Sequence, residues 1–261
     1  MYCLAMALGR QVSPPAFVQL AAHPVRWQLL TELAGSDLRV RELVASVGQP
    51  QNLVSYHLRL LRNSGLVTAR RSSADARDSY HHLDLDRCAH ALSATGAALH
   101  PALLPSPPAA GVAPGDRVSV LFACTGNSAR SPIAEALLRH RSPGGVAATS
   151  AGSHPKAQLH PAAVQVLREH YGIDVAAQRP RHLDTFTGRR FDHVVTLCDK
   201  VREVCPEFGD RARRIHWSIP DPAAVEDTGG AGHPAFVRTA AEIDTRVRHL
   251  LATIATQEAH P

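Results

Sequence analysis

The chain has 261 residues, 28 lysines and arginines against 23 acidic residues for a net charge of +5, and 44% hydrophobic side chains. This length suits one large domain or two ordinary ones, and the apolar fraction suffices for packed cores. No run reaches the ~18 apolar residues of a membrane helix, and the first residues lack the charged start of a secretory signal, so we expect a cytoplasmic protein. Five cysteines, an odd and sparse set, do not indicate a disulfide framework.

A stretch rich in alanine, proline and glycine divides the chain. Residues 93–116 read SATGAALHPALLPSPPAAGVAPGD, are nearly uncharged and show no helical or strand periodicity. The prolines in it fix φ and remove amide donors, which favours a semi-extended linker. We predict a linker over residues 96–115 between a first domain at 12–95 and a second at 116–258. The alternative is a surface loop within one domain.

The first part of the chain shows helical patterns followed by two strand-like runs. Apolar spacing predicts helices over residues 17–34, with a break at Pro24, and over 40–48 and 52–65. A glycine ends each of the last two helices. The runs LVTARR and DSYHHLDLD predict two strands around a polar loop. Two short helices joined by a tight turn and followed by a hairpin form a winged helix-turn-helix, a mainly α-helical fold.

This part, LAAHPVRWQLLTELAG…VRELVASVGQPQNLVSYHLRLLRNSGLV, resembles the ArsR family of metal- and metalloid-responsive repressors over about residues 15–92. The resemblance implies a homodimer formed through this domain, with a recognition helix in the major groove of operator DNA. Polar and arginine side chains suit base edges and phosphate oxygens. The residues expected at the DNA are Gln51, Asn52, Ser55, Tyr56, His57 and Arg59 in the recognition helix, and Arg70, Arg71 and Arg77 in the wing. The alternative is a helical dimerisation module that no longer binds DNA.

The arsenic-sensing site of the ArsR family is absent from this chain. Many arsenic-sensing members carry a Cys-x-Cys pair where this chain reads LRVRE at residues 38–42, and arginine offers no thiolate. Cys3 and Cys88 remain possible ligands, so sensing stays open. Three further residues loosely match a metal site of other members: Asp86, His90 and His100. Their spacing is poor and the chain has 16 histidines, which favours solvated side chains, and we expect no bound metal.

The sharpest motif of the chain lies at residues 117–140. An apolar strand over 118–123 runs into Cys124-Thr-Gly-Asn-Ser-Ala-Arg130, followed by Ser131, Pro132 and a helix. A small-residue loop between a strand and a helix N-terminus is typical of sites for tetrahedral oxyanions, because successive amides point inward and the helix end is positive. The residues expected to bind the oxyanion are Thr125, Gly126, Asn127, Ser128, Ala129 and Arg130.

Two side chains of this loop indicate covalent chemistry. The positive field of the loop is expected to lower the pKa of the Cys124 thiol and to supply thiolate at neutral pH. The planar guanidinium of Arg130 can hold two oxygens at once. The alternative for Cys124 is an inert, buried cysteine at the end of a strand.

The rest of the chain alternates between strand and helix patterns. Strands are predicted over residues 145–152, 191–198 and 213–217, and helices over 161–172 and from 236 through the C-terminus. Such alternation indicates an α/β domain in which a four-stranded parallel sheet is flanked by helices. The cysteine loop then lies at the carboxyl end of a strand, where ligands of such sheets bind.

The segments VLFACTGNSARSPIAEA, TSAGSHP, FDHVVTLCDKVREVCPEF and HWSIPDP together resemble the thioredoxin-coupled arsenate reductases of the low-molecular-weight protein tyrosine phosphatase fold. The resemblance covers about residues 116–258 and implies a relay of three cysteines. Cys124 attacks arsenate, Cys198 attacks Cys124 and releases arsenite, and Cys205 attacks Cys198. Asp221 protonates the departing oxygen, and Ser131 hydrogen-bonds the Cys124 sulfur. Thioredoxin or another thiol system then reduces the last disulfide, and no tightly bound cofactor is required.

Some of these relatives hold a potassium ion beside the loop. Asn127, Glu135 and Ser150 match three of the four positions that bind it, but the fourth, an Asp in those relatives, aligns near Arg181. A cation opposite a guanidinium is unfavourable, so we predict no potassium site.

The sequence thus indicates an ArsR-like regulator fused to an arsenate reductase, with arsenate, operator DNA and a thioredoxin-like reductant as partners. Because phosphate and arsenate have nearly the same shape and charge, two alternatives stay open. In the first alternative, the second domain is a protein tyrosine phosphatase. In the second, the protein is a repressor whose second domain only binds oxyanions.

Overall fold

Five helices and a small antiparallel sheet make up the first part of the described chain. The computed structural model describes residues 13–100, 103, 118–209, 212–224 and 232–258. The elements of the N-terminal region, residues 13–100, are α1 (Ala16–Ala21), α2 (Pro24–Gly35), β1 (Leu38–Arg39), α3 (Val40–Val47), α4 (Gln51–Asn63), β2 (Val67–Arg71), β3 (Ser79–Leu83) and α5 (Leu85–Leu99). Strand β3 pairs antiparallel with both β1 and β2. The helix-turn-helix α3–α4 and the hairpin β2–β3, called the wing below, confirm the predicted winged fold.

Local signals explain where these helices begin and end. Helix α3 starts with a capping box, in which the main-chain N–H of Arg39 donates to the Glu42 carboxylate at 2.8 Å. It ends at Gly48, which has φ of 66°, a conformation that glycine adopts without steric cost. Helix α5 contradicts one expectation, because it continues through residues 93–99, where no helical periodicity was recognised. Most of the predicted linker, residues 101–102 and 104–115, lies outside the described residues, as does the predicted start of the first domain at residue 12.

The C-terminal region, residues 118–258, is built on a parallel sheet. Its elements are β4 (Val118–Cys124), α6 (Arg130–Arg141), β5 (Val146–Gly152), α7 (Pro161–Tyr171), the 3-10 helix η2 (Leu183–Phe186), β6 (His193–Thr196), α8 (Asp199–Val204), β7 (Arg213–His216) and α9 (Gly232–Glu258). The strand order is β5-β4-β6-β7, and all three pairings are parallel. This confirms the predicted four-stranded α/β fold and places the carboxyl end of β4 in the interior of the sheet.

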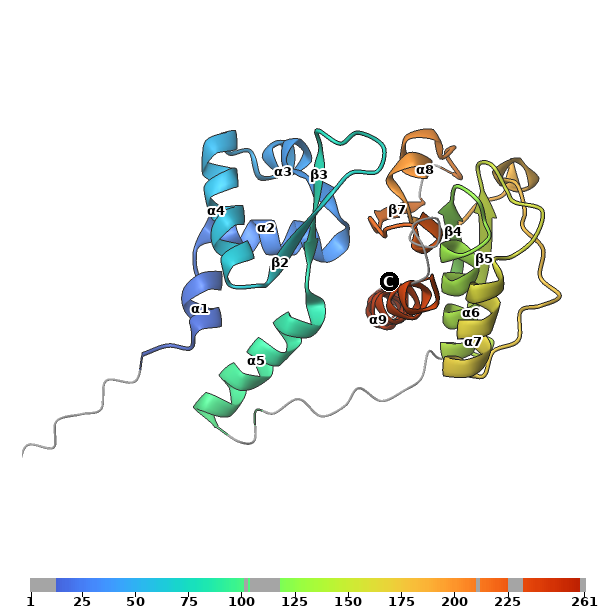
Figure 1. Ribbon diagram of the computed structural model, residues 1–261. Helices are drawn as coiled ribbons and strands as arrows, with labels where there is room; N and C mark the ends of the chain where they lie inside the picture. The colour runs from blue at the N-terminus through green and yellow to red at the C-terminus, as the bar shows by residue number, and fades with distance from the viewer. Residues whose placement is uncertain (1–12, 101–102, 104–117, 210–211, 225–231, 259–261) are drawn as a thin grey trace, which may run out of the picture.

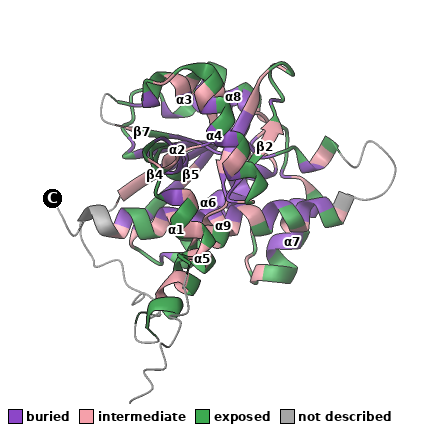
Figure 2. Ribbon diagram, turned by 90° about the vertical axis from the view of Figure 1, so that its left-hand side faces the viewer, coloured by how far each residue is buried: buried purple, intermediate pink, exposed green. Residues whose placement is uncertain are grey.

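Each region has its own hydrophobic core. Strand β4 is buried from Val120 to Cys124, and α9 buries side chains at helical spacing from Phe236 to Ile254, as predicted. The N-terminal core gathers around Leu29, Leu43 and Leu58 and shares no buried residue with the first. Figure 2 shows buried residues running through the strands and along α9. Among the described helices, none is long and apolar enough to cross a membrane.

The two regions face each other through a polar interface. In Figure 1 the wing and the end of α2 lie toward β7, α8 and α9, while α4 lies on the opposite side of the N-terminal region. The main-chain N–H of Asp37 donates to the His216 carbonyl at 2.9 Å, and the N–H of His216 donates to the Ser36 hydroxyl at 2.9 Å. Buried Asp37 also accepts two hydrogen bonds at 3.1 Å from Arg246 of α9.

Candidate functional site

The loop after β4 has its carbonyl groups turned outward. The segment that follows β5 donates main-chain hydrogen bonds to them: His154 to Thr125 at 2.9 Å, Lys156 to Gly126 at 2.9 Å and His160 to Ser128 at 2.8 Å. Because C=O and the next N–H point in opposite directions across a trans peptide, the amides that follow these carbonyls point to the inside of the loop. This arrangement fits an anion, and it brings together the loop residues predicted for oxyanion binding.

Two residues fix the sharp turn of the loop. Asn127 is fully buried with φ of 43°, a left-handed conformation that asparagine tolerates better than most residues. Its amide Nδ2 donates to Ser131 and to Ser150, both at 2.9 Å. Gly152, at the end of β5, allows the close approach, because a Cβ there would lie 2.6 Å from the Thr125 carbonyl oxygen. The loop therefore depends on side chains from both neighbouring elements.

The Cys124 sulfur lies 3.0 Å from the Ser131 hydroxyl, as the resemblance implied. The expected fall in its pKa is not found. Burial raises the pKa of the Cys124 thiol above its ordinary value, while Arg130 and the hydrogen bonds from Ser131 lower it only in part. Burial has the larger effect, because the side chain of Cys124 is 2% exposed and removal from water disfavours the thiolate.

Arg130 joins the loop to the segment after β7. One of its terminal nitrogens donates to the Ile219 carbonyl at 2.9 Å, and the other donates to Asp221 at 2.8 Å. The Asp221 side chain is 48% exposed, whereas that of Arg130 is 7% exposed. The carboxyl group predicted to act as an acid is therefore next to the loop and open to solvent.

A cavity of about 470 Å³ opens over Cys124, the loop, Arg130 and Asp221. Three basic side chains at this cavity were missed by the sequence analysis: His154, Lys156 and His160. The chain has only two lysines, and Lys156 is exposed beside Gly126. Its position four residues after the TSAG motif was the available signal, since that segment returns to the loop.

The two further cysteines of the predicted relay lie at different distances from the loop. The Cys198 sulfur is 3.3 Å from the Thr125 hydroxyl and close enough to Cys124 for their charges to interact. Cys205 follows α8 and is buried, which raises the pKa of its thiol to about 11. All three are free thiols.

Arg181 contacts two of the residues that match the potassium site of the relatives, Asn127 and Glu135. Glu135 is buried, accepts a hydrogen bond from Ser150 at 2.5 Å, and pairs with Arg181 at 2.8 Å. The main-chain N–H of Arg181 donates to Asn127 at 2.7 Å. Arg181 thus supplies positive charge beside Glu135, at the position that aligns with the fourth potassium ligand of the relatives.

Most residues predicted to contact DNA from α4 are exposed. They are Gln51, Asn52, Ser55, Tyr56 and Arg59. His57 is a correction, because it is 3% exposed and its ring lies 4.3 Å from that of His23. The buried residues of α4 are Val54, His57, Leu58 and Leu61, and His57 lies on their face of the helix because it follows Val54 by three positions and precedes Leu61 by four.

The wing residues divide in the same way. Arg71 and Arg77 are exposed, and Arg77 pairs with Asp75. The prediction for Arg70 is wrong, because its guanidinium donates to the Ser218 carbonyl at 3.2 Å and to Glu242 of α9 at 2.7 and 3.0 Å. The reason is that β2 faces the C-terminal region at this position.

The residues weighed for metal sensing do not come together in the described part of the chain. Asp86 pairs with His249 of α9 at 3.2 Å, and His90 contacts the Asp86 carbonyl. Burial raises the pKa of the Cys88 thiol to about 11, and Cys3 lies outside the described residues.

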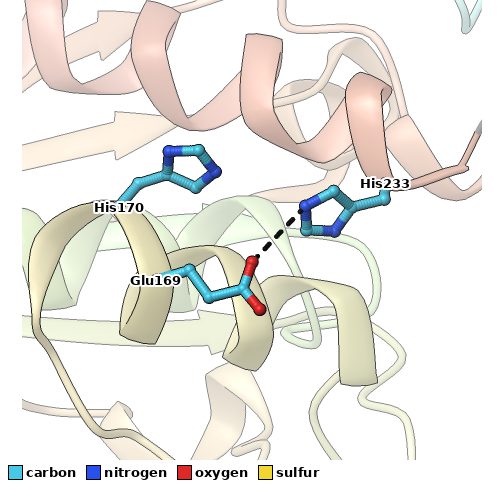
Figure 3. Close-up of side chains that lie close together, drawn as sticks. All are labelled: Glu169, His170 and His233. Carbon is cyan, nitrogen blue, oxygen red and sulfur yellow. Dashed lines mark ion pairs between the residues drawn. The ribbon is translucent and has the colours of Figure 1, made fainter.

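One group that the sequence analysis did not anticipate has metal-ligating side chains. Glu169 and His170 of α7 and His233 of α9 place one ligand atom each within 4.8 Å of one another, as Figure 3 shows. Glu169 and His170 are exposed, and the ion pair between Glu169 and His233 is 3.7 Å long. A solvated surface pair accounts for this geometry, and no ligand is assigned to it.

A cysteine at the carboxyl end of a parallel strand, followed by an anion-binding loop and an arginine, defines the class of loop-thiol enzymes that act on tetrahedral oxyanions. Residues 119–260, more than half of the chain, match the family described as low molecular weight phosphotyrosine protein phosphatase. The chain belongs to this family. Residues 23–69 match the family described as bacterial regulatory protein, arsR family.

Curated relatives carry a consistent name. A protein from Halalkalibacterium halodurans named arsenate reductase is 34% identical over 134 residues, which cover 51% of this chain and 95% of that protein. An arsenate reductase from Shouchella clausii is 35% identical over 136 residues, covering 51% and 95%. Among solved structures, an arsenate reductase from Archaeoglobus fulgidus matches with a TM-score of 0.42 and 30% identity, covering 51% of this chain and 98% of that one.

Proposed function

We propose that the C-terminal region reduces arsenate to arsenite through Cys124, Cys198 and Cys205. The observation that carries this proposal is a second thiol at the oxyanion loop: Cys198 contacts Thr125 at 3.3 Å while Cys124 contacts Ser131. A phosphatase needs one nucleophile, an acid and water, whereas reduction of As(V) needs a second thiol. The names of the curated relatives favour the same activity.

The reaction starts with oxyanion binding by the inward amides and Arg130. The Cys124 thiolate attacks the arsenic atom, an oxygen leaves with a proton from Asp221, and an S–As bond forms. Cys198 then attacks the Cys124 sulfur. The electron pair of the broken S–As bond stays on arsenic, which leaves as arsenite, and the two thiols become a disulfide.

Arg130 and Ser131 prepare Cys124 for this attack. Arg130 pairs with Asp221, so we expect an oxyanion to compete for the guanidinium and to release the carboxyl group at the moment an acid is required. The hydrogen bond from Ser131 favours the thiolate and partly opposes the effect of burial on the pKa of Cys124.

Cys205 completes the cycle. It attacks Cys198, a Cys198–Cys205 disulfide forms, and Cys124 leaves as a thiol. Thioredoxin or another dithiol then reduces this disulfide, and no tightly bound cofactor takes part.

Turnover of arsenate with thioredoxin, thioredoxin reductase and a nicotinamide donor tests the enzyme. Cys124→Ser, Cys198→Ser and Cys205→Ser should each lose catalytic turnover, while Cys88→Ser, a free thiol outside the site, should keep it. Hydrolysis of an aryl phosphate that survives Cys198→Ser, without arsenate turnover, would identify a phosphatase instead. Absence of turnover with every reductant would leave a protein that only binds oxyanions.

We propose that the N-terminal region binds operator DNA as a dimer and that the two cores are separate domains joined by residues 96–115. The exposed polar face of α4 supports base contacts, and the exposed side chains of Arg71 and Arg77 support contacts with phosphates. Helix α5 buries none of its own residues and exposes Leu92 and Leu99, so a second copy of the chain is a suitable partner for it. Arsenite made by the enzyme would then relieve repression at the same promoter.

Gel-shift assays with the DNA upstream of the gene test this part. Arg71→Gln should weaken binding and reduce the slope of log K against log salt by about 0.9, the value for one phosphate contact. Arg168→Gln on α7, an exposed arginine remote from α4 and the wing, is the matched control. Binding that arsenite does not affect would remove the regulatory link and leave the enzyme intact.

A further inference from the structure

Helix α8 separates the two cysteines that must form the last disulfide of the proposed relay. Cys198 is the residue before this helix and Cys205 the residue after it. At 1.5 Å of rise per residue, the two Cα atoms lie roughly 10 Å apart along the axis. A disulfide requires Cα atoms about 4.4–6.8 Å apart. The bond can therefore form only after α8 unwinds.

The folded helix also keeps Cys205 unreactive. The thiol is 8% exposed, and burial raises its pKa to about 11, so little thiolate is present at neutral pH. Unwinding of α8 would move this thiol toward solvent and toward Cys198 in the same step.

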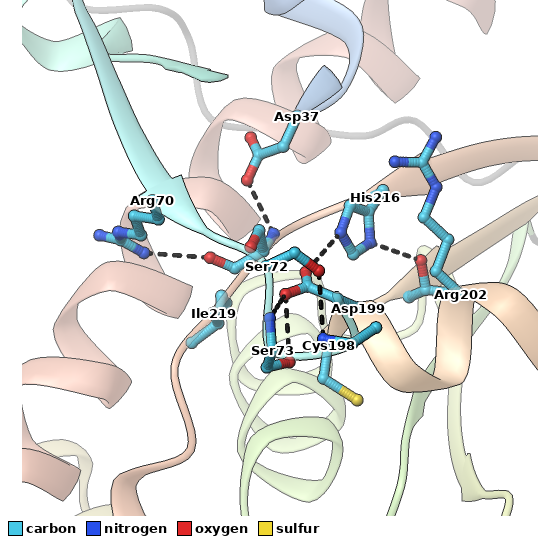
Figure 4. Close-up of polar contacts among 12 residues, drawn as sticks. Asp37, Arg70, Ser72, Ser73, Cys198, Asp199, Arg202, His216 and Ile219 are labelled. Atoms are coloured by element: carbon cyan, nitrogen blue, oxygen red, sulfur yellow. Dashed lines mark hydrogen bonds and ion pairs between the residues drawn. The ribbon is translucent and has the colours of Figure 1, made fainter. Parts of the chain in front are cut away.

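Residues of the N-terminal region hold α8 in place. At its first turn, the Asp199 carboxylate accepts hydrogen bonds from the N–H and the hydroxyl of Ser73 in the wing, at 2.6 and 3.1 Å. Arg202 pairs with Glu42 of α3 at 2.7 Å, and Glu203 pairs with Arg39 at 3.2 Å. Figure 4 shows the wing end with Ser73 directly against Asp199 and Cys198.

The centre of this contact is buried. Three residues at this contact are each no more than 3% exposed: Asp199, His216 and the wing residue Tyr80. Asp199 pairs with His216 at 3.1 Å, and the Tyr80 ring lies 4.6 Å from the His216 ring. The Arg202 guanidinium lies 5.1 Å from the centre of the Tyr80 ring, within the range of a cation–π interaction. Because these groups are withdrawn from water, breaking the contact costs more than breaking exposed pairs.

We propose that α3 and the wing of the N-terminal region stabilise the helical form of α8 and thereby set how readily the Cys198–Cys205 disulfide forms. Glu42, Ser73 and Tyr80 are then positioning residues for the relay, contributed by the region that carries the helix-turn-helix. The inference rests on the proposed function, since it concerns the last disulfide of that cycle.

Coupling of this kind acts in both directions. If the N-terminal region favours the dithiol form, formation of the disulfide must weaken the contact of α8 with the wing by the same free energy. The redox state of the enzyme is thereby transmitted to the wing, whose arginines Arg71 and Arg77 are the ones we expect at DNA phosphates.

The equilibrium between dithiol and disulfide measures this coupling without arsenate. In a Cys124→Ser background, the protein is equilibrated with mixtures of glutathione and glutathione disulfide, in which two glutathione thiols appear for each disulfide formed. Alkylation and mass mapping then give the fraction of Cys198–Cys205 disulfide. Arg202→Gln on α8 and Glu42→Gln on α3 each remove the ion pair between the two helices. Each variant should raise the equilibrium constant for disulfide formation about tenfold, which makes the reduction potential about 30 mV more negative.

Matched controls separate this effect from general destabilisation. Arg168→Gln changes an exposed arginine of α7 that pairs with Asp174, away from α8 and the wing, and should leave the potential unchanged. The double variant Arg202→Gln/Glu42→Gln should shift the potential by less than the sum of the single variants, because both remove one ion pair. Circular dichroism identifies the variants that fold. Equal reduction potentials in all of these would contradict the coupling but not the cysteine relay.

Hydrogen exchange gives an independent readout. The Ser73 amide, bonded to Asp199 at 2.6 Å in the dithiol form, should lose protection when the disulfide forms, whereas the α4 amides should not change. Unchanged protection at Ser73 would overturn the proposal. If no Cys198–Cys205 disulfide forms in any variant, the relay of the proposed function fails as well, and arsenate turnover distinguishes that case from loss of the coupling alone.

Discussion

The oxyanion loop and helix α8 carry the sulfur atoms of one proposed reaction, yet they are held in opposite ways. The loop is fixed from within the C-terminal region, by Asn127, Gly152 and the segment that follows β5. Helix α8 is fixed by residues that precede it by more than 100 positions, such as Ser73. We infer from this difference that oxyanion binding depends on the C-terminal region alone. Unwinding of α8, the step in which the chain must move, depends also on contacts with the N-terminal region.

The largest effect is expected from a substitution at the interface between the two regions. Asp37 is 2% exposed, and burial alone would raise its pKa, but Arg246 and His82 hold the pKa well below its usual range. Asp37→Asn removes the buried carboxylate partner of Arg246, which keeps the partly exposed Glu242 at 3.2 Å, and should cost roughly 3 kcal/mol in the free energy of unfolding. Denaturant unfolding measures this cost. Asp75→Asn, in an exposed pair, is the control, and an equal effect in both would contradict a buried ionic interface.

The loop itself should respond in activity rather than in stability. In Gly152→Ala the new Cβ would lie 2.6 Å from the Thr125 oxygen and 2.9 Å from the Asn127 nitrogen, so the loop must shift. A displacement of about 1 Å at reacting groups lowers turnover by about 100-fold. Gly35→Ala, where the nearest atom is 3.9 Å away, should turn over arsenate normally. Normal turnover in Gly152→Ala would show that the loop tolerates a different geometry.

The same contrast explains what the sequence could predict. The loop was recognised because its chemistry lies in consecutive residues, Cys124 to Ser131, and its strand and helix precede and follow directly. Arg70 was assigned to DNA because its partner Glu242 lies 172 positions away, beyond any local pattern. For the same reason the anchoring of α8 and the raised pKa of Cys124, which follows from burial of its side chain, could not be predicted from spacing.

His57 shows a smaller failure of the same kind. The helix was predicted, but His57 was assigned to the DNA together with the other polar residues of α4. It shares the buried face of Val54 and Leu61, and its ring lies 4.3 Å from that of His23, the N-cap of α2 and 34 positions earlier in the chain. Residue polarity alone therefore placed this side chain on the wrong face of a correctly predicted helix.

The pH dependence of stability should follow from a histidine next to the interface. Burial lowers the pKa of His81 on β3 from its ordinary 6.5 to about 4. Between pH 6.5 and 4 the unfolded chain binds a proton at this position and the folded protein does not, so the free energy of unfolding falls as the pH falls. Denaturant midpoints across this window should show the slope, and His81→Gln should flatten it. A slope unchanged in His81→Gln would assign the effect to other histidines.

The smallest expected effect concerns the cation beside the loop. Arg181 pairs with Glu135 at 2.8 Å and donates its main-chain N–H to Asn127, so its guanidinium supplies the charge that a potassium ion would bring. A second cation next to it would be repelled. Arsenate turnover at constant ionic strength should therefore be equal in potassium and sodium salts. In Arg181→Gln the buried Glu135 loses Arg181 and keeps Arg139 at 2.8 Å, so part of its charge is uncompensated; turnover should fall and should then be higher in potassium than in sodium. A preference for potassium in the unchanged protein would show that the loop has a cation site. The geometry of the loop would then depend on a bound ion as well as on the C-terminal residues that contact it.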